Sequence, residues 1–108
     1  MEEAVVHFRQ VVAEVPGDAA ARERLVATLT SLGEEAAAKP DATAAAGYYR
    51  ELVELAPSDA DLHNNYGIIL ARSGNIVRAI DQFEAALKVN PAHLAARRNL
   101  ELARKRLP

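Results

Sequence analysis

Histidine and serine are the residue types in this chain with the most familiar reactive chemistry. The histidines are His7, His63 and His93, and the serines are Ser31, Ser58 and Ser73. The histidines belong to different expected helices, and none has a second histidine or a cysteine at a metal-ligand spacing. The serines stand near expected helix ends, where a hydroxyl caps backbone groups. The sequence therefore predicts no enzyme and no metal or cofactor site, and it favours packed or surface roles for the histidines.

Two amphipathic helices joined by a tight turn are expected between Asp59 and Pro91. Apolar residues recur there at steps of three and four, which is the spacing of one helix face. Ser58 or Asp59 can cap the first helix, Gly74 can end it in a left-handed conformation, and Asn75 can cap the second. Each helix has one apolar stripe, so the hairpin needs neighbouring helices to cover it.

The signals of this hairpin recur along the chain. An alanine, an aromatic residue four positions later and a proline eight positions after that occur three times. The three sets are Ala4, Phe8 and Pro16; Ala45, Tyr49 and Pro57; and Ala79, Phe83 and Pro91. The last two sets are separated by about 34 residues, a repeat period that is typical of helical repeat proteins.

The pattern resembles the tetratricopeptide repeat, in which W-x2-L-G-x2-Y, A-x3-F and P recur about every 34 residues. The matching positions are His63, Tyr66, Gly67, Leu70, Ala79, Phe83 and Pro91. The match is strongest in the second half, because His63 replaces the tryptophan of the family pattern. The resemblance implies an all-α fold, a superhelix of antiparallel helical hairpins with about six helices stacked in a right-handed arc.

The resemblance also divides the chain, which is expected to form one domain over residues 1–108. Its parts are the second helix of a partial repeat (1–16), a repeat with an insertion (18–57), a standard repeat (59–91) and a C-terminal capping helix (92–108). The inner face of the capping helix is expected to hold Leu94, Leu100, Ala103 and Leu107.

The middle repeat is longer than its neighbour, because the separation of Pro16 and Pro57 exceeds the repeat period by about two helical turns. The excess is placed near residues 33–40. It either extends the first helix to about Ala38 or forms a loop after Gly33, and the helix-forming Glu and Ala residues favour the extension. Val26 is assigned to the glycine position of the family pattern, which is expected to push this hairpin apart.

A binding groove on the inner face of the first helices is a further implication of the resemblance. Asn65 and Asn99 are one repeat period apart and resemble the asparagine ladder of O-linked N-acetylglucosamine transferases, while Arg24 takes the equivalent place in the middle repeat. A side-chain amide donates to a peptide carbonyl and accepts from an N–H. The expected groove residues are Asn64, Asn65, Ile68, Arg72, Arg98 and Asn99. An equally weighted alternative is that the asparagines only steady helix packing.

Composition and charge limit the function further. The net charge of −2 combines eleven acidic and five basic residues in 1–60 (−6) with four acidic and eight basic residues in 61–108 (+4). Nucleic acid is not expected as a partner, because no aromatic side chain is interleaved with the arginines of the last helix. No apolar run reaches the length of a membrane span. A soluble chain is expected, with a cytoplasmic location favoured.

Two functional hypotheses remain at this point. The first is a protein-interaction scaffold that binds a peptide or partner protein through the groove. The alternative is a structural or self-associating end of a repeat array within a larger protein, which includes an accessory segment of an enzyme. Self-association would use the apolar face of the N-terminal helix around Val5 and Phe8.

Overall fold

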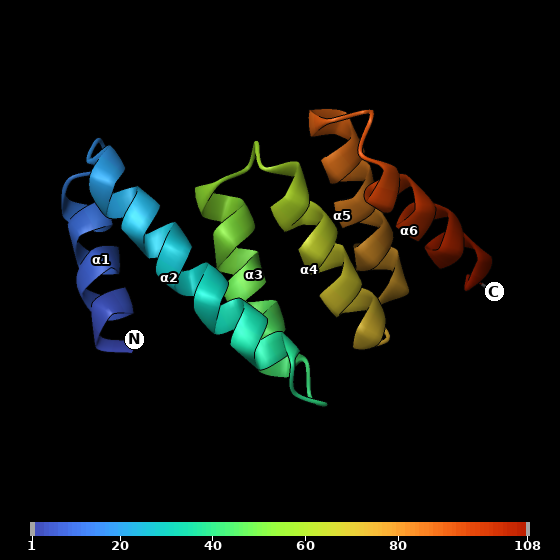
Figure 1. The fold of residues 1–108 in the computed structure, drawn as a ribbon, viewed down its shortest axis with the longest axis horizontal. Helices are drawn as coiled ribbons and strands as arrows, with labels where there is room; N and C mark the ends of the chain where they lie inside the picture. The colour runs from blue at the N-terminus through green and yellow to red at the C-terminus, as the bar shows by residue number, and fades with distance from the viewer. Residues whose placement is uncertain (1, 108) are drawn as a thin grey trace.

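The computed structural model describes residues 2–107, and all regular secondary structure in this range is helical (Figure 1). The helices are α1 (Glu2–Glu14), α2 (Ala19–Ala37), α3 (Thr43–Leu55), α4 (Ala60–Arg72), α5 (Ile76–Val89) and α6 (Leu94–Lys105). They follow one another in chain order along the longest dimension of the molecule, 44 Å, and the connections alternate between the top and the bottom of the view in Figure 1. The prediction of six helices in an all-α hairpin fold is confirmed.

The ends of the hairpin helices α4 and α5 are set by the expected residues. The carboxylate of Asp59 accepts from the backbone N–H of Leu62 at 3.2 Å, so Asp59 rather than Ser58 caps α4. Gly74 follows α4 with a φ of +85°, a backbone conformation that glycine adopts without strain. The side chain of Asn75 then accepts from the N–H of Arg78 and begins α5.

A glycine and an aromatic ring determine how closely the helices of a hairpin approach. A Cβ atom on Gly67 of α4 would lie 2.5 Å from Cε1 of Phe83 on α5. Phe83 is only 1% exposed and belongs to the packed core. The same pairing occurs in the preceding hairpin, where a Cβ on Gly33 of α2 would lie 3.1 Å from Cε2 of Tyr49 on α3.

This geometry corrects the expected register of α2. Gly33 and Gly67 are one repeat period apart, as are Tyr49 and Phe83, so Gly33 and not Val26 holds the glycine position. Helix α2 continues through Gly33 to Ala37, so the residues directly after Gly33 are helical and do not form the alternative loop. The additional length lies at the beginning of α2, where the helix packs against α1, and not near residues 33–40.

The inner face of α6 also differs from the expected one. Leu100 and Ala103 are buried as expected, but the third buried residue of this helix is Ala96. Leu94 is 75% exposed. It stands six residues before Leu100, and this spacing puts the two leucines on different sides of the helix. Leu107 is also exposed, since α6 ends before it.

Candidate functional site

Two hollows lie side by side over the first helices of the hairpins. The hollow between α2 and α4 has a volume of about 370 Å³, and its lining is Glu34, Ala37, Ala38, Tyr49, Asn65, Ile68, Ile69 and Arg72. The hollow between α4 and α6 has a volume of about 290 Å³, and its lining is Ile68, Ala71, Arg72, Phe83, Asn99, Leu102, Ala103 and Arg106. Both hollows contain Ile68 and Arg72, so they adjoin. We refer to the two hollows together as the groove.

An amide pair joins α4 and α6 beside the groove. The Nδ2 atom of Asn99 donates to Oδ1 of Asn64 at 3.0 Å. Asn64 is only 6% exposed, so it holds the side chain of Asn99 and presents little surface of its own. The Oδ1 atom of Asn99 makes no hydrogen bond to a described residue and remains available as an acceptor.

Arg72 lies where the two hollows meet, and its guanidinium group is held in place by α2. Nη1 donates to the carbonyl of Ala37 at 2.8 Å, and Nη2 donates to the carbonyl of Lys39 at 3.1 Å. Helix α2 ends without a glycine in the left-handed conformation, so its last carbonyls need donors from elsewhere. The arginine supplies these donors and thereby gains a fixed position in the groove.

Four of the six expected groove residues line the hollows: Asn65, Ile68, Arg72 and Asn99. Asn64 lies beneath them, and Arg98 is exposed but lines neither hollow. The register set by Gly33 also places Ser31, and not Arg24, one repeat period before Asn65.

The structure adds Glu34 and Arg106, which were not expected in the groove, and Leu102, expected on the same face as Asn99, also lines it. Arg106 stands one repeat period after Arg72, so the period itself was a signal for this position.

Glu34 lies near Tyr49 of α3. Burial raises the pKa of the Tyr49 phenol above its usual value, and the carboxylate of Glu34 raises it further.

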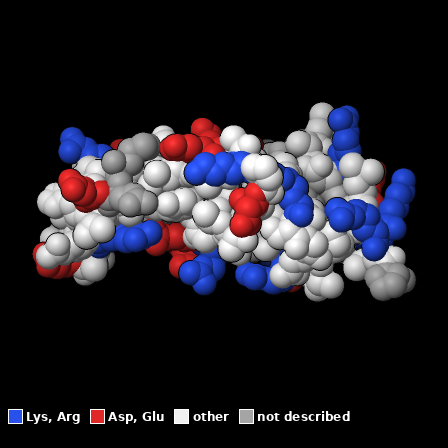
Figure 2. Space-filling view, turned by 90° about the horizontal axis from the view of Figure 1, so that it is seen from below, with Lys and Arg blue, Asp and Glu red and all other residues white. Residues whose placement is uncertain are grey.

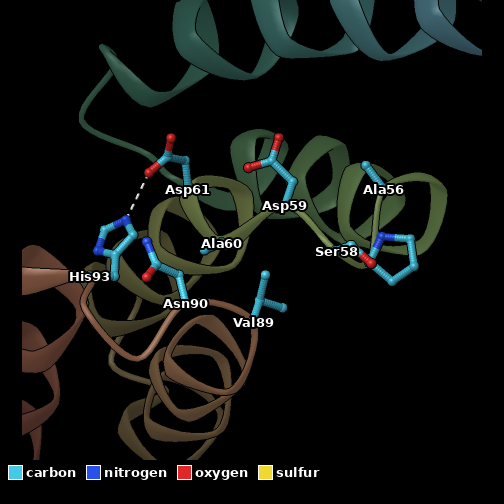
Figure 3. Close-up of a pocket in the computed structure, with 9 residues that line it drawn as sticks. Ala56, Ser58, Asp59, Ala60, Asp61, Val89, Asn90 and His93 are labelled. Carbon is cyan, nitrogen blue, oxygen red and sulfur yellow. Dashed lines mark hydrogen bonds and ion pairs between the residues drawn. The ribbon is translucent and has the colours of Figure 1, made fainter.

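The histidines that contact other elements have structural partners. Nε2 of His63 lies 2.8 Å from the carbonyl of Pro57, and Nδ1 lies 2.8 Å from Oε1 of Gln82, so the ring ties α4 to α5 and to the preceding loop. His93 caps α6 by accepting from the N–H of Ala96 through Nδ1. Its Nε2 donates to Asp61 at 2.7 Å, the contact drawn as a dashed line in Figure 3.

This close-up shows a third hollow, of about 520 Å³, between the α3–α4 and α5–α6 connections (Figure 3). Of its charged or titratable side chains, Asp59 and His93 already serve as helix caps, and Asp61 is the partner of His93. Among residues 2–107, no group of three or more His, Asp or Glu side chains is arranged to hold a metal ion. No helix in the same range is long and apolar enough to cross a membrane.

Charge is distributed unevenly over the surface. Figure 2 shows basic side chains over much of the visible face, with a group of them at the α6 end, where almost no acidic side chain is visible. Arg97, Arg98, Arg104, Lys105 and Arg106 are all exposed on or directly after α6. This end of the groove therefore has a positive surround, which favours a ligand with negative charge.

The stacked antiparallel hairpins and the groove along their first helices define a helical repeat protein of the solenoid class. The tetratricopeptide repeat family model matches residues 30–92, more than half of the chain, and the chain belongs to this family. The match begins one repeat period before Asn64, in agreement with the register set by Gly33. No curated protein sequence matches the chain significantly. Tetratricopeptide repeats generally mediate protein–protein interactions and are typically non-catalytic scaffolds.

Proposed function

We propose that this chain is a protein-interaction module that holds an extended segment of a partner protein in the groove over α2, α4 and α6. The observation that carries the proposal is the continuity of the two hollows through Ile68 and Arg72. A continuous strip that passes over three helices suits an extended chain better than a compact small molecule.

The groove combines the two kinds of surface that a peptide requires. Ile68 and Leu102 offer exposed apolar area, 37% and 54% of their surfaces respectively. Asn65 and Asn99 offer amide groups that pair with backbone N–H and C=O groups of any sequence. Such recognition tolerates many sequences, and the charged residues around it select among them.

The expected affinity is modest. The groove is short, and a flexible peptide loses conformational entropy when it docks, so dissociation constants in the micromolar range are expected as an order of magnitude. Because the basic side chains around α6 are exposed, added salt should weaken the binding of an acidic segment.

A titration of the ¹⁵N-labelled chain with a pool of random dodecapeptides tests the proposal. The backbone amide signals of Asn65, Ile68 and Asn99 should shift more than those of α3 and α5. Shifts confined to α3 and α5, or no shift at millimolar peptide, would contradict groove binding.

Self-association through α1 is the second candidate. The expected face is not free, because Val5 is 3% exposed and Phe8 packs against the core. The apolar surface that remains is that of Val6, which is 63% exposed, and of Val15 directly after the helix, which is also exposed. If α1 mediates association, the signals of Val6 should shift as the concentration of the chain itself increases, in the absence of peptide. The two candidates are thus separated by which component is titrated.

A further inference from the structure

We propose that the hollow between α4 and α6 is an anchor subsite for an acidic side chain that stands next to an apolar one within the partner segment. This inference rests on the proposed function, and it specifies the chemistry that this part of the groove selects. It concerns side-chain carboxylates of an internal Glu or Asp residue.

The floor of the hollow is apolar. Its carbon surface comes from five residues of three helices: Ile68, Ala71, Phe83, Leu102 and Ala103. Phe83 and Ala103 are buried and rigid, while Ile68 and Leu102 stand exposed on either side. An aliphatic side chain of the ligand would cover both exposed residues, and this burial of apolar surface favours binding.

Two guanidinium groups border the same hollow. Arg72 is the last residue of α4, and Arg106 comes directly after α6. The two arginines stand at equivalent positions one repeat period apart. Within residues 2–107, neither arginine makes an ion pair with a carboxylate. A guanidinium group binds a carboxylate through two parallel hydrogen bonds. Hydrogen bonds between charged groups are stronger than hydrogen bonds between neutral groups.

The position of Arg72 is fixed before any ligand binds. The carbonyls of Ala37 and Lys39 occupy one N–H of each terminal nitrogen, and a guanidinium group has five N–H donors in total. Three donors are left for a ligand. A group that is already ordered loses little side-chain entropy on binding, so Arg72 is suited to orient a carboxylate.

Asn99 determines which backbone group of the ligand lies above the floor. One N–H of its Nδ2 atom donates to the buried Asn64, and its Oδ1 atom, which has no hydrogen bond to a described residue, can accept one from the ligand. The complementary group on the ligand is a backbone N–H. The subsite therefore offers an acceptor for one peptide unit, an apolar floor for one side chain and two cations for the next.

The acidic residue is placed inside the segment and not at its carboxyl end. Arg72 stands at the junction of the hollows, so a segment that fills both hollows continues past this residue in both directions. Glu34 lines that second hollow and would repel a second acidic group. The ligand should thus carry its acidic side chain toward α6 and neutral residues toward α2.

A matched peptide set tests the subsite. The reference probe is the blocked octapeptide acetyl-GSALEASG-amide, and it is compared with versions that carry Gln for Glu or Ser for Leu, and with a free-acid peptide that ends at Leu. Binding is followed by ¹⁵N NMR titration up to 5 mM peptide, a limit on the order of the weakest useful affinities. The reference peptide should bind about tenfold more tightly than the Gln and Ser versions, as expected for the loss of one charged pair or one buried side chain.

Variants of the chain provide the second arm. Arg72→Gln and Arg106→Gln should each weaken the binding of the reference peptide about tenfold and the binding of the Gln peptide clearly less. Arg104→Gln removes the same charge from α6 outside both hollows and should change the affinity less than about twofold. Leu102→Ala should weaken binding, whereas Leu94→Ala, an exposed leucine on the same helix, should not.

Several results would overturn the inference. These are equal binding of the Glu and Gln peptides, equal effects of Arg104→Gln and Arg106→Gln, binding of the free-acid peptide alone, or no binding of the reference peptide. If the random peptide pool still shifts Asn65 and Ile68 in any of these cases, the groove remains and only the acidic subsite is removed. If the pool shifts neither, the proposed function fails as well.

Discussion

Single contacts between a glycine and an aromatic ring set the spacing of the hairpins. Gly67 faces Phe83 and Gly33 faces Tyr49, each pair at the crossing of a first and a second helix. His63 adds a polar tie at the position where the family pattern has tryptophan, because both of its ring nitrogens contact neighbouring elements. The close approach of α4 and α5 thus depends on a missing Cβ atom and not on helix propensity.

Gly67→Ala should lower the free energy of unfolding by about 1–3 kcal/mol, because the new Cβ would overlap the ring of Phe83. Gly47→Ala is the matched control. Gly47 lies within α3 with no atom within 4 Å of its Cβ position, so alanine there should raise the free energy of unfolding by about 0.5–1 kcal/mol. Urea denaturation of both variants checks the pair. Equal effects would show that Gly67 does not govern the approach.

The buried phenol of Tyr49 predicts an alkaline limit to stability. Its pKa is raised in the folded state, so above the usual value of 10.0 the unfolded chain releases the proton while the folded chain retains it. The stability associated with this group is present below pH 10 and is lost as the pH rises through the folded pKa. Tyr49→Phe should therefore reduce the fall in melting temperature between pH 9 and pH 11, a range about one unit either side of the unfolded pKa. An unchanged fall would contradict the assignment.

Helix ends show a difference between α2 and α4 that affects the groove. Gly74 follows the end of α4, and the N–H groups of Gly74 and Asn75 donate to the carbonyls of Ala71 and Leu70 respectively. Helix α2 has no such glycine, and Arg72 from the neighbouring repeat bonds the carbonyls of Ala37 and Lys39. One arginine therefore connects the end of one first helix to the next and lines both hollows.

Arg72→Ala should loosen the last turn of α2. The amides of Ala38 and Lys39, which bond Glu34 and Ala36, should exchange with solvent about threefold to tenfold faster, as expected for the loss of hydrogen bonds worth about 0.5–1.5 kcal/mol each. Hydrogen exchange followed by NMR measures this directly. Arg104→Ala on α6 should leave these amides unchanged, and equal acceleration in both variants would exclude a specific tie.

The sequence was sufficient for the existence of the helices and for the caps of the α4–α5 hairpin, because apolar periodicity and the residues Asp59, Gly74 and Asn75 are local signals. The capping of α6 by His93 was not predicted. The register of α2 was not predictable in the same way. Val26 and Gly33 are about two helical turns apart on the same face, and only the contact with Tyr49 distinguishes them. The groove was predicted in part. The pairing of Asn99 with Asn64 depends on how α4 and α6 sit together, which the repeat period alone does not specify.

Across the whole molecule, burial is greatest near the middle of the row of helices. Helix α4 has seven buried residues, since hairpins cover it from both directions. In α1, by contrast, Val5 is buried, whereas Val6 on the same helix is mostly exposed. Because each repeat is stabilised mainly by its neighbours, stability in a solenoid is expected to be highest in the middle and lower at the ends.

Native-state hydrogen exchange should therefore show the largest protection in α4 and the smallest in α1. The amides of Tyr66 and Gly67 should exchange only by global unfolding, whereas those of α1 should exchange by local opening with a free energy several-fold smaller. Added denaturant separates the two modes. Uniform protection over α1 and α4 would contradict a stability gradient along the chain.

The groove itself is tested most directly at Ile68, the apolar residue common to both hollows. Peptides selected from a random display library on the wild-type chain are measured against Ile68→Asp and against Val77→Asp, an equally simple change at an exposed aliphatic residue of α5. If the peptides bind in the groove, Ile68→Asp should lower their affinity at least about tenfold, because a charge replaces apolar contact area. Val77→Asp should lower the affinity less than about twofold. Equal losses, or a larger loss for Val77→Asp, would contradict the groove as the binding surface.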